Sequence, residues 1–347
     1  MSHPGIISRE PLEDLGRQLG SRLGVAGSMV MPFVDFTDFL TALLEHVDCE
    51  AGRVIVGGHA TPEVAIAADR AGLSLEETLG PTPFIGHIED LVPAIATGRE
   101  IVYLACPNRV TGADYALKDL EALAGRVKDG TLIVDEKYFD FYGISALPLL
   151  EKNANVLIVR SLTAGFGIRS DDSGFLIGSP GLIGSFKEVF RWTGISTTLY
   201  KIIITILANE KARARRLATL HDESLRLATN LTRRGVQNRI TSTDFLLLRV
   251  ADPTRVGNFL AKHGTPIENL DGYPGLKNYV RYVIQSPISN DRLLNAFERM
   301  PSEFYKMDNI DKRSMMFHRP TEGLAEREAP ATRSRLAETE LVGAEER

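Results

Sequence analysis

Apolar residues follow two different spacings along residues 30–200, and each spacing predicts one kind of element. Phe39, Leu40, Leu43 and Leu44 recur on one helix face, which predicts a helix at 36–47. Short continuous apolar runs are instead typical of strands that are buried on both faces of a sheet. Strands are predicted at 53–57, 73–75, 101–105, 131–135, 156–159 and 175–178, alternating with helices at 12–23, 36–47, 62–71, 87–95 and 115–127.

This alternation predicts an α/β fold in which a mainly parallel sheet is sandwiched by helices. A long charged helix is expected from Thr205 to about Thr232. After Gly235 the pattern predicts a smaller C-terminal α+β domain, with strands at 243–250 and 279–284 and helices at 252–263 and 289–300. The predicted division is an N-terminal arm at 1–29, a large domain at 30–215, a small domain at 216–307 and a polar, disordered tail at 308–347.

The composition excludes several classes of protein. The 347 residues carry a formal net charge of -5, which gives no basis for binding nucleic acid or an anionic membrane. No apolar run approaches the roughly 20 residues that span a bilayer, and no basic segment with a following apolar run begins the chain. Cys49 and Cys106 lie in dissimilar contexts, which is typical of a reducing compartment. We therefore expect a cytoplasmic protein without a metal site.

Polar clusters follow two neighbouring predicted strands. Asp135 and Tyr138 come after one strand, and Ser161 and Thr163 come after the next, while the loop 107–112 ends the strand before them. In open α/β sheets ligands bind outside the carboxyl ends of the strands. The sequence therefore predicts a ligand site where the strands that precede Asp135 and Ser161 end.

Four short motifs, taken in order along the chain, resemble those of one known family. They are PNRVTG at 107–112, similar to PNNPTG; DEKY at 135–138, similar to DEAY; SLTAGFG at 161–167, similar to SLSKAFG; and YVR at 279–281. By these motifs the sequence is identified as a member of the fold-type-I pyridoxal-phosphate superfamily. It is most similar to class I and II aminotransferases of the histidinol-phosphate aminotransferase type.

The resemblance implies a role for each matching residue and a homodimer, because family active sites lie at the subunit interface. Asp135 would hold the pyridine nitrogen protonated, which makes the cofactor ring an electron sink. Arg281 would grip a substrate carboxylate with two hydrogen bonds. The remaining implied ligands are Asn108 and Tyr138 at the phenolic oxygen of the ring, and Ser161 and Thr163 near the phosphate.

Several family positions are occupied by residues that cannot perform the family's chemistry. Ala164 stands where the Schiff-base lysine is expected, and it has no amine. Asp172 replaces the phosphate arginine and would repel a phosphate. The glycine-rich phosphate cup falls at 34–37, VDFT, and the stacking aromatic falls at Thr61. Such coordinated losses predict a pseudo-aminotransferase without covalent cofactor chemistry.

Lys137 occupies a position where the family has a small residue. If the strand continued past Asp135, Lys137 would share its face and project into the ring volume. Three interpretations stay open for it: a structural salt bridge with Asp135, or an outward lysine where the strand is already ending; a relocated amine nucleophile; or a contact to a different, anionic ligand. Lys137 and Tyr138 are the candidate catalytic residues, while His59, after Gly57, is a weaker candidate acid or base.

Three hypotheses for function follow. The first is a pseudo-aminotransferase whose cleft binds or transforms a small amino or carboxylate metabolite, with no cofactor. The second is a biosynthetic enzyme that works on the same fold without pyridoxal phosphate. The third is a family enzyme that holds pyridoxal phosphate non-covalently. The sequence leaves open whether a reaction is catalysed.

Overall fold

The computed structural model describes residues 6–7, 9–47, 49–162, 164–166, 173–190 and 195–307. Thr163, Asp172 and the tail predicted at 308–347 lie outside the described residues. The predicted domain boundaries stay a prediction.

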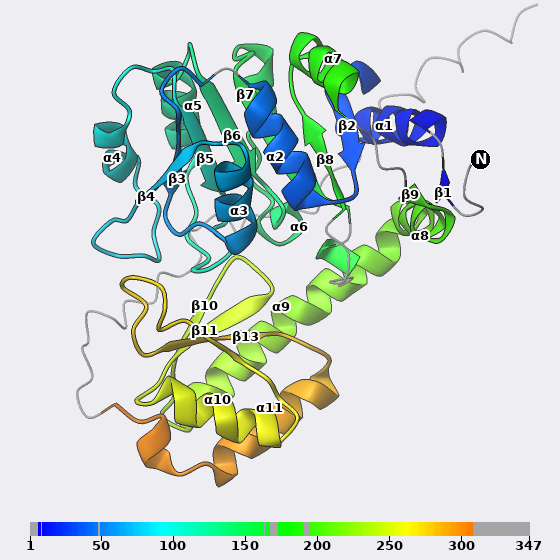
Figure 1. The fold of residues 1–347 in the computed structure, drawn as a ribbon. Coiled ribbons are helices and arrows are strands. Elements are labelled where there is room, and N and C mark those ends of the chain that lie inside the picture. Colours follow the sequence, from blue (N-terminus) through cyan, green and yellow to red (C-terminus); the bar gives the residue numbers. More distant parts are fainter. Residues whose placement is uncertain are drawn as a thin grey trace, which may run out of the picture. The chain divides into compact units, whose positions relative to one another are not determined.

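A seven-stranded sheet has the order β2-β8-β7-β6-β5-β3-β4 (Figure 1). Within it β8 pairs antiparallel with both of its neighbours, while β7, β6, β5, β3 and β4 pair in parallel. The mainly parallel sheet predicted from the alternation is therefore confirmed. The strands are β2 (Val30–Phe33), β3 (Arg53–Gly57), β4 (Ser74–Thr78), β5 (Ile101–Ala105), β6 (Thr131–Asp135), β7 (Val156–Ser161) and β8 (Gly174–Ile177).

Helices cover both faces of this sheet, as predicted. Alternate residues of a strand point to opposite faces, and neighbours such as Ile133 and Val134 accordingly belong to different apolar clusters. The cluster on one face includes residues of α1 (Arg9–Leu23), α5 (Leu117–Arg126) and α8 (Thr197–Ala208). The cluster on the other face includes residues of α2 (Phe36–His46), α3 (Pro62–Arg70) and α7 (Pro180–Val189). The shorter elements are β1 (Ile6–Ile7), paired with β9 (Ile195–Ser196), α4 (Ile88–Leu91) and α6 (Phe139–Tyr142).

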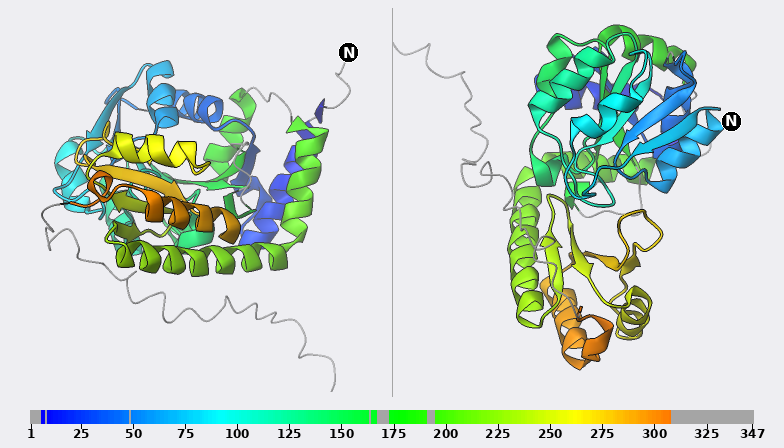
Figure 2. Two further views of the ribbon diagram at one scale, coloured as in Figure 1. Left: turned by 90° about the horizontal axis from the view of Figure 1, so that it is seen from below. Right: turned by 90° about the vertical axis from the view of Figure 1, so that its left-hand side faces the viewer.

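A second, antiparallel sheet has the order β10-β11-β13-β12 and forms the predicted C-terminal α+β part. In Figure 2 the long helix α9 runs along this sheet. The buried faces of α9, α10 and α11 share one apolar cluster with β11 and β13. The elements are α9 (Glu210–Arg233), β10 (Gln237–Ile240), β11 (Phe245–Arg249), α10 (Pro253–Lys262), β12 (Glu268–Asn269), β13 (Tyr279–Val283) and α11 (Pro287–Arg299).

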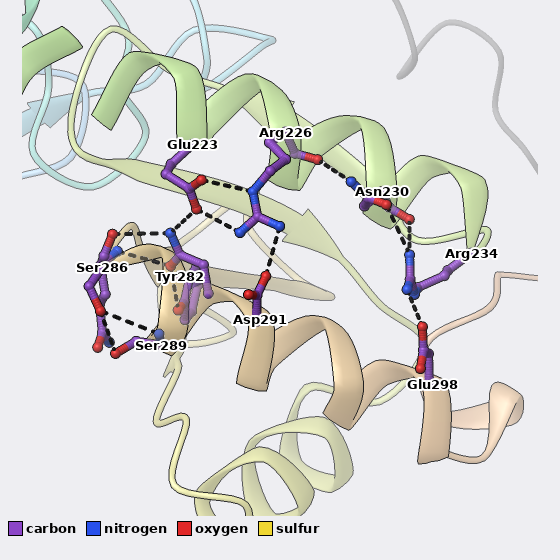
Figure 3. A network of polar contacts seen from close by, with 11 residues as sticks. Glu223, Arg226, Asn230, Arg234, Tyr282, Ser286, Ser289, Asp291 and Glu298 are labelled. Carbon is purple, nitrogen blue, oxygen red and sulfur yellow. Dashed lines mark hydrogen bonds and ion pairs between the residues drawn. The ribbon is translucent and has the colours of Figure 1, made fainter. Parts of the chain in front are cut away.

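Polar side chains join α9 to α11 beside this apolar cluster (Figure 3). Arg226 binds Glu223 through two nitrogens, both at 2.8 Å, and reaches Asp291 at 2.8 Å. Buried Asn290 donates to Glu223 at 2.7 Å and accepts from the Tyr282 hydroxyl at 3.0 Å. Hydrogen bonds from Arg226 lower the pKa of Glu223, although its burial opposes them. The network therefore holds an ionised carboxylate between the two helices.

Several predicted elements differ from the observed ones for local reasons. The helix predicted at 205–232 is wrong as a single element, because Asn209 ends α8 and caps α9 by accepting from the Ala212 N–H. The helix predicted at 87–95 is only α4, which continues into a 3₁₀ turn that contains Pro93. The sequence did not predict β2, which contains Pro32, or α7. No helix among the described residues is long and apolar enough to cross a membrane.

Candidate ligand site

The register of the large sheet brings the predicted site segments to one edge. Ala105 at the end of β5 pairs with Asp135 at the end of β6, and Asp135 pairs with Val159 near the end of β7. β2 runs antiparallel to β8, which runs antiparallel to β7, so β2 also ends at this edge. Phe36, the first residue of α2, therefore begins its helix close to the predicted site.

Asp135 is buried and both of its carboxylate oxygens have partners within the protein. The Tyr103 hydroxyl donates to Oδ2 at 2.5 Å, and the Lys137 backbone N–H donates to Oδ1 at 2.9 Å. Burial, and then the charge of Asp135, raises the pKa of Tyr103 well above its usual value, which keeps the phenol protonated. Tyr103 was not predicted as a site residue. The sequence feature that could have identified it is a tyrosine within an apolar strand, two residues before that strand ends.

Asn108 holds the loop 106–113 against the end of β3. Its Oδ1 accepts from the backbone N–H groups of Val110 and Thr111 at 2.9 and 3.1 Å, which closes the turn. Its Nδ2 donates to the His59 carbonyl at 2.9 Å. Gly112 completes the turn with a φ of 72°, in the left-handed region that favours glycine. The side chain thus has a structural task in addition to any contact with a ligand.

The Lys137 ammonium lies over the ring of Phe36, with Nζ 3.0 Å from the ring centroid. The side chain of Phe36 is fully buried, and Lys137 is 7% exposed. Of the two courses left open for the backbone at Lys137, the strand does not continue: β6 ends at Asp135. The Asp135 carboxylate turns the backbone there by accepting the Lys137 N–H. Asp135 thus contacts the backbone of Lys137.

The remaining predicted residues lie at separate places around the edge. Tyr138 is half-buried, and its ring packs edge-on against Phe141 and Phe245, with centroids 5.7 and 6.2 Å away. Ser161, at the end of β7, accepts from the backbone N–H of Ala164 at 3.0 Å. Ala164 begins a single 3₁₀ turn. The roles implied for these residues stay predictions.

Arg281, the predicted carboxylate ligand, is engaged by neighbouring groups. Its Nε donates to Glu268 at 2.8 Å, its Nη2 contacts the same carboxylate, and its Nη1 donates to the carbonyl of Arg109. β12 and β13 place Glu268 directly opposite Arg281. This arrangement ties the second sheet to the loop that carries Arg109.

Two charged residues near this edge were not predicted at all. Arg109 follows Asn108, and Glu63 lies in the first turn of α3, with Nη1 of Arg109 3.9 Å from Oε2 of Glu63. Burial opposes the charge of Arg109, but the nearby Asp135 and Glu63 outweigh it and raise its pKa. Thr61 is the residue before α3, as predicted, but its side chain makes no capping hydrogen bond. Among the described residues, no three His, Cys, Asp or Glu side chains are grouped so as to hold a metal ion.

Comparison with known families supports the arrangement of strands and loops. The family model "Aminotransferase class I and II" matches residues 84–285, which is more than half of the chain and includes the loop at Asn108, Asp135 and Arg281. The chain belongs to the class I and II aminotransferase family. The resemblance carried by the short motifs is therefore confirmed at the level of the family.

A sequence relative and two solved structures extend this comparison. A histidinol-phosphate aminotransferase of Chlorobium phaeovibrioides is 28% identical over 237 residues, which cover 66% of this chain and 65% of that protein. The chain thus matches less than two thirds of the length of this relative. The structure of histidinol-phosphate aminotransferase from Sinorhizobium meliloti, in complex with pyridoxal-5'-phosphate, is similar with a TM-score of 0.74 and 20% identity, covering 84% of this chain and 82% of that one. The corresponding enzyme of Clostridium acetobutylicum gives a TM-score of 0.74 at 16% identity, with 84% and 90% covered. At these identities the structures establish the fold alone.

Proposed function

We propose that this aminotransferase-family protein forms no covalent bond with pyridoxal phosphate and uses the same edge of the sheet to bind a small amino or carboxylate metabolite. The observation that carries the proposal is the pair of changes at Ala164 and Lys137. The position expected to supply the amine holds a methyl group, while the amine of Lys137 is buried over Phe36. We also propose a homodimer, which the mass in solution tests.

The charges around Asp135 support the proposal. Glu63, Glu77 and Asp135 supply three carboxylates near this edge, and Arg109 and Lys137 supply two cations. A cofactor phosphate would add more negative charge beside these partly buried groups, among which the carboxylates outnumber the cations. This balance of charge supports the proposal that pyridoxal phosphate is not bound in the way the resemblance implies.

The partners of Asp135 point in the same direction. The resemblance implies that this carboxylate holds the pyridine nitrogen of the cofactor. In the structure one of its oxygens accepts a hydrogen bond from the Tyr103 hydroxyl, and the other accepts one from the Lys137 backbone N–H. The Tyr103 bond, at 2.5 Å, is a short hydrogen bond to an ionised acceptor, the kind that is strongest in proteins. A cofactor ring would have to share or displace it.

The experiment adds pyridoxal phosphate to the purified full-length protein and records the visible absorbance. Borohydride reduction and intact-mass measurement then detect any cofactor fixed to a lysine. We expect no adduct, whereas the Sinorhizobium meliloti enzyme treated in parallel should give one. An adduct that disappears in Lys137→Ala would overturn the proposal and make Lys137 a relocated nucleophile. A change in the cofactor's absorbance spectrum that saturates with protein concentration, without an adduct, would instead favour non-covalent binding of pyridoxal phosphate.

A further inference from the structure

His59 is a buried histidine where the end of the large sheet meets a loop of the second sheet. It follows β3 and is 2% exposed. The loop is the β12–β13 loop, residues 270–278, whose Tyr273 packs edge-on against the imidazole with ring centroids 5.4 Å apart. The backbone of Pro274, in the same loop, hydrogen-bonds the imidazole. Oε2 of Glu77, on β4, lies 4.0 Å from Nδ1 of His59. The imidazole therefore has a carboxylate of the large sheet and a loop of the second sheet as its neighbours.

The β12–β13 loop docks against loops at the carboxyl-end edge of the large sheet. Leu270 and Leu276 are fully buried, in one apolar cluster with Val110 and Phe84 from the loops that follow β5 and β4. The β12–β13 loop also has hydrogen bonds of its own, because Tyr273 N–H donates to the Leu270 carbonyl at 2.9 Å and Leu276 N–H donates to the Tyr273 carbonyl at 3.0 Å. It is therefore a compact unit that contacts the large sheet through its apolar side chains and through the imidazole.

The environment of His59 favours the neutral imidazole. Burial lowers the pKa of the ring, and Glu77 and the Pro274 carbonyl only partly oppose this. At neutral pH the ring is therefore uncharged and has one donor and one acceptor nitrogen. An imidazole that has left the loop and meets water has a pKa of about 6.5. A proton consequently binds His59 more tightly when the loop is undocked than when it is docked.

Two other ionisable groups at this contact keep one charge state near neutral pH. Burial, and then Glu268, raises the pKa of Tyr273, so the phenol stays neutral; Arg281, which pairs with Glu268, opposes this only in part. Burial opposes the charge of Glu63, which also lies near Tyr273, but a neighbouring hydroxyl and Arg109 outweigh it and lower the pKa of the carboxyl. Neither Tyr273 nor Glu63 changes its charge between pH 7.5 and 5.5, the range in which an imidazole does.

We propose that His59 is an acid-sensitive latch, whose neutral imidazole holds the β12–β13 loop against the large sheet and whose protonation releases the loop. By linkage, docking that depends on the neutral ring is complete above the pKa of the free group and weakens as the pH falls through the pKa of the docked group. The proton comes from solvent. Release of the loop exposes the edge that carries the candidate site. The inference concerns access to this edge and does not depend on which ligand binds there.

The experiment follows hydrogen exchange of the full-length protein by mass spectrometry at pH 7.5, 6.5 and 5.5, with rates corrected for the intrinsic pH dependence of exchange. Protection of an amide reports the free energy of the opening that exposes it. The reporters are the hydrogen-bonded amides of Tyr273 and Leu276. We expect their protection to fall at least threefold between pH 7.5 and 5.5. Amides of α10, in the same part of the chain, should keep their protection.

Substitutions then assign the response to His59. His59→Gln cannot take up a proton in this range, so the protection of the loop should become independent of pH. His221→Gln, at an exposed histidine of α9, is the matched control and should respond as the wild type does. Glu77→Gln keeps an oxygen that can accept from the Ala60 N–H, as Glu77 does at 2.8 Å, but removes the charge that favours a protonated ring. This variant should enlarge the loss of protection at pH 5.5.

Three results would overturn the inference: protection of the loop that does not change with pH in the wild type, a pH response that survives His59→Gln, or a smaller response in Glu77→Gln. Parallel loss of protection in α10 would also overturn it, because the whole domain would then be opening. Circular dichroism and Tm at each pH confirm that the variants are folded. The wild type and Glu77→Gln test the latch without altering His59 itself.

Discussion

The contact between Lys137 and Phe36 leads to a quantitative prediction of how strongly these two side chains stabilise each other. Nζ lies 3.0 Å from the ring centroid, and both side chains are buried. A cation over an aromatic ring contributes about 2 kcal/mol or more when the pair is removed from water. We therefore expect a coupling free energy of about 2 kcal/mol between the two side chains.

A double-mutant cycle isolates this coupling. Lys137→Met removes the charge at similar length, and Phe36→Leu removes the ring while keeping an apolar side chain. Single substitutions are ambiguous, because Lys137→Met also removes the cost of burying an ammonium group and Phe36→Leu also loses packing. Urea unfolding of the wild type, both single variants and the double variant cancels these separate effects and leaves the interaction.

The control cycle pairs Phe36→Leu with Lys118→Met, because Lys118 is exposed on α5. This cycle should give no coupling beyond the roughly 0.5 kcal/mol within which independent sites add. A coupling of that small size between Lys137 and Phe36 would refute the reasoning. The position of the ammonium would then not depend on the ring.

Two further predictions concern buried carboxylates near the edges of the large sheet. Glu100 accepts backbone N–H groups of Ala96, Thr97 and Gly98, which outweigh its burial and hold its pKa at about 2. Because this pKa is depressed in the folded state, ionised Glu100 should add up to about 3 kcal/mol to the free energy of unfolding above pH 5. Urea unfolding should show that Glu100→Gln loses this free energy at pH 7. The difference between the variant and the wild type should shrink as the pH falls from about 5 towards 2. Arg160→Met should lower the free energy of unfolding by about 3–5 kcal/mol in the same assay, because it leaves Glu136 buried without the Arg160 nitrogen 2.9 Å away. Adding Glu136→Gln to this variant should recover part of the loss. An Arg160→Met variant as stable as the wild type would contradict this prediction.

The fold was predictable from the sequence because its strands are apolar runs that end abruptly in polar residues. The runs that end at Ala105 and Asp135 marked the sheet and its functional edge, since parallel neighbours end together. β2 was missed because Pro32 argues against a central strand, whereas in the structure it lies at the sheet's edge, where proline is tolerated.

The candidate site was only partly predictable, because its details depend on where backbones turn. A period of two places Lys137 on the same face as Asp135 only if the strand continues, and the sequence left that open. In the structure the strand ends, because the Asp135 carboxylate accepts the Lys137 backbone N–H. Arg109 and Glu63 come from segments far apart in the sequence, and Asn108 brings them together by binding the His59 carbonyl. No spacing along the chain encodes such a contact.

Asp135 has a structural task within the protein that does not depend on a cofactor. Its resemblance to the cofactor-holding aspartate would suggest a bound cofactor if it were considered alone. In this protein the same carboxylate accepts from Tyr103 and from the Lys137 backbone, so it fixes β5 against β6 and sets the turn that directs Lys137. Removing it would leave a buried phenol without its acceptor, a cost that any cofactor-free protein on this fold would still bear. The presence of Asp135 therefore does not discriminate between a cofactor-binding and a cofactor-free protein, and the test has to come from the residues at 164 and 137.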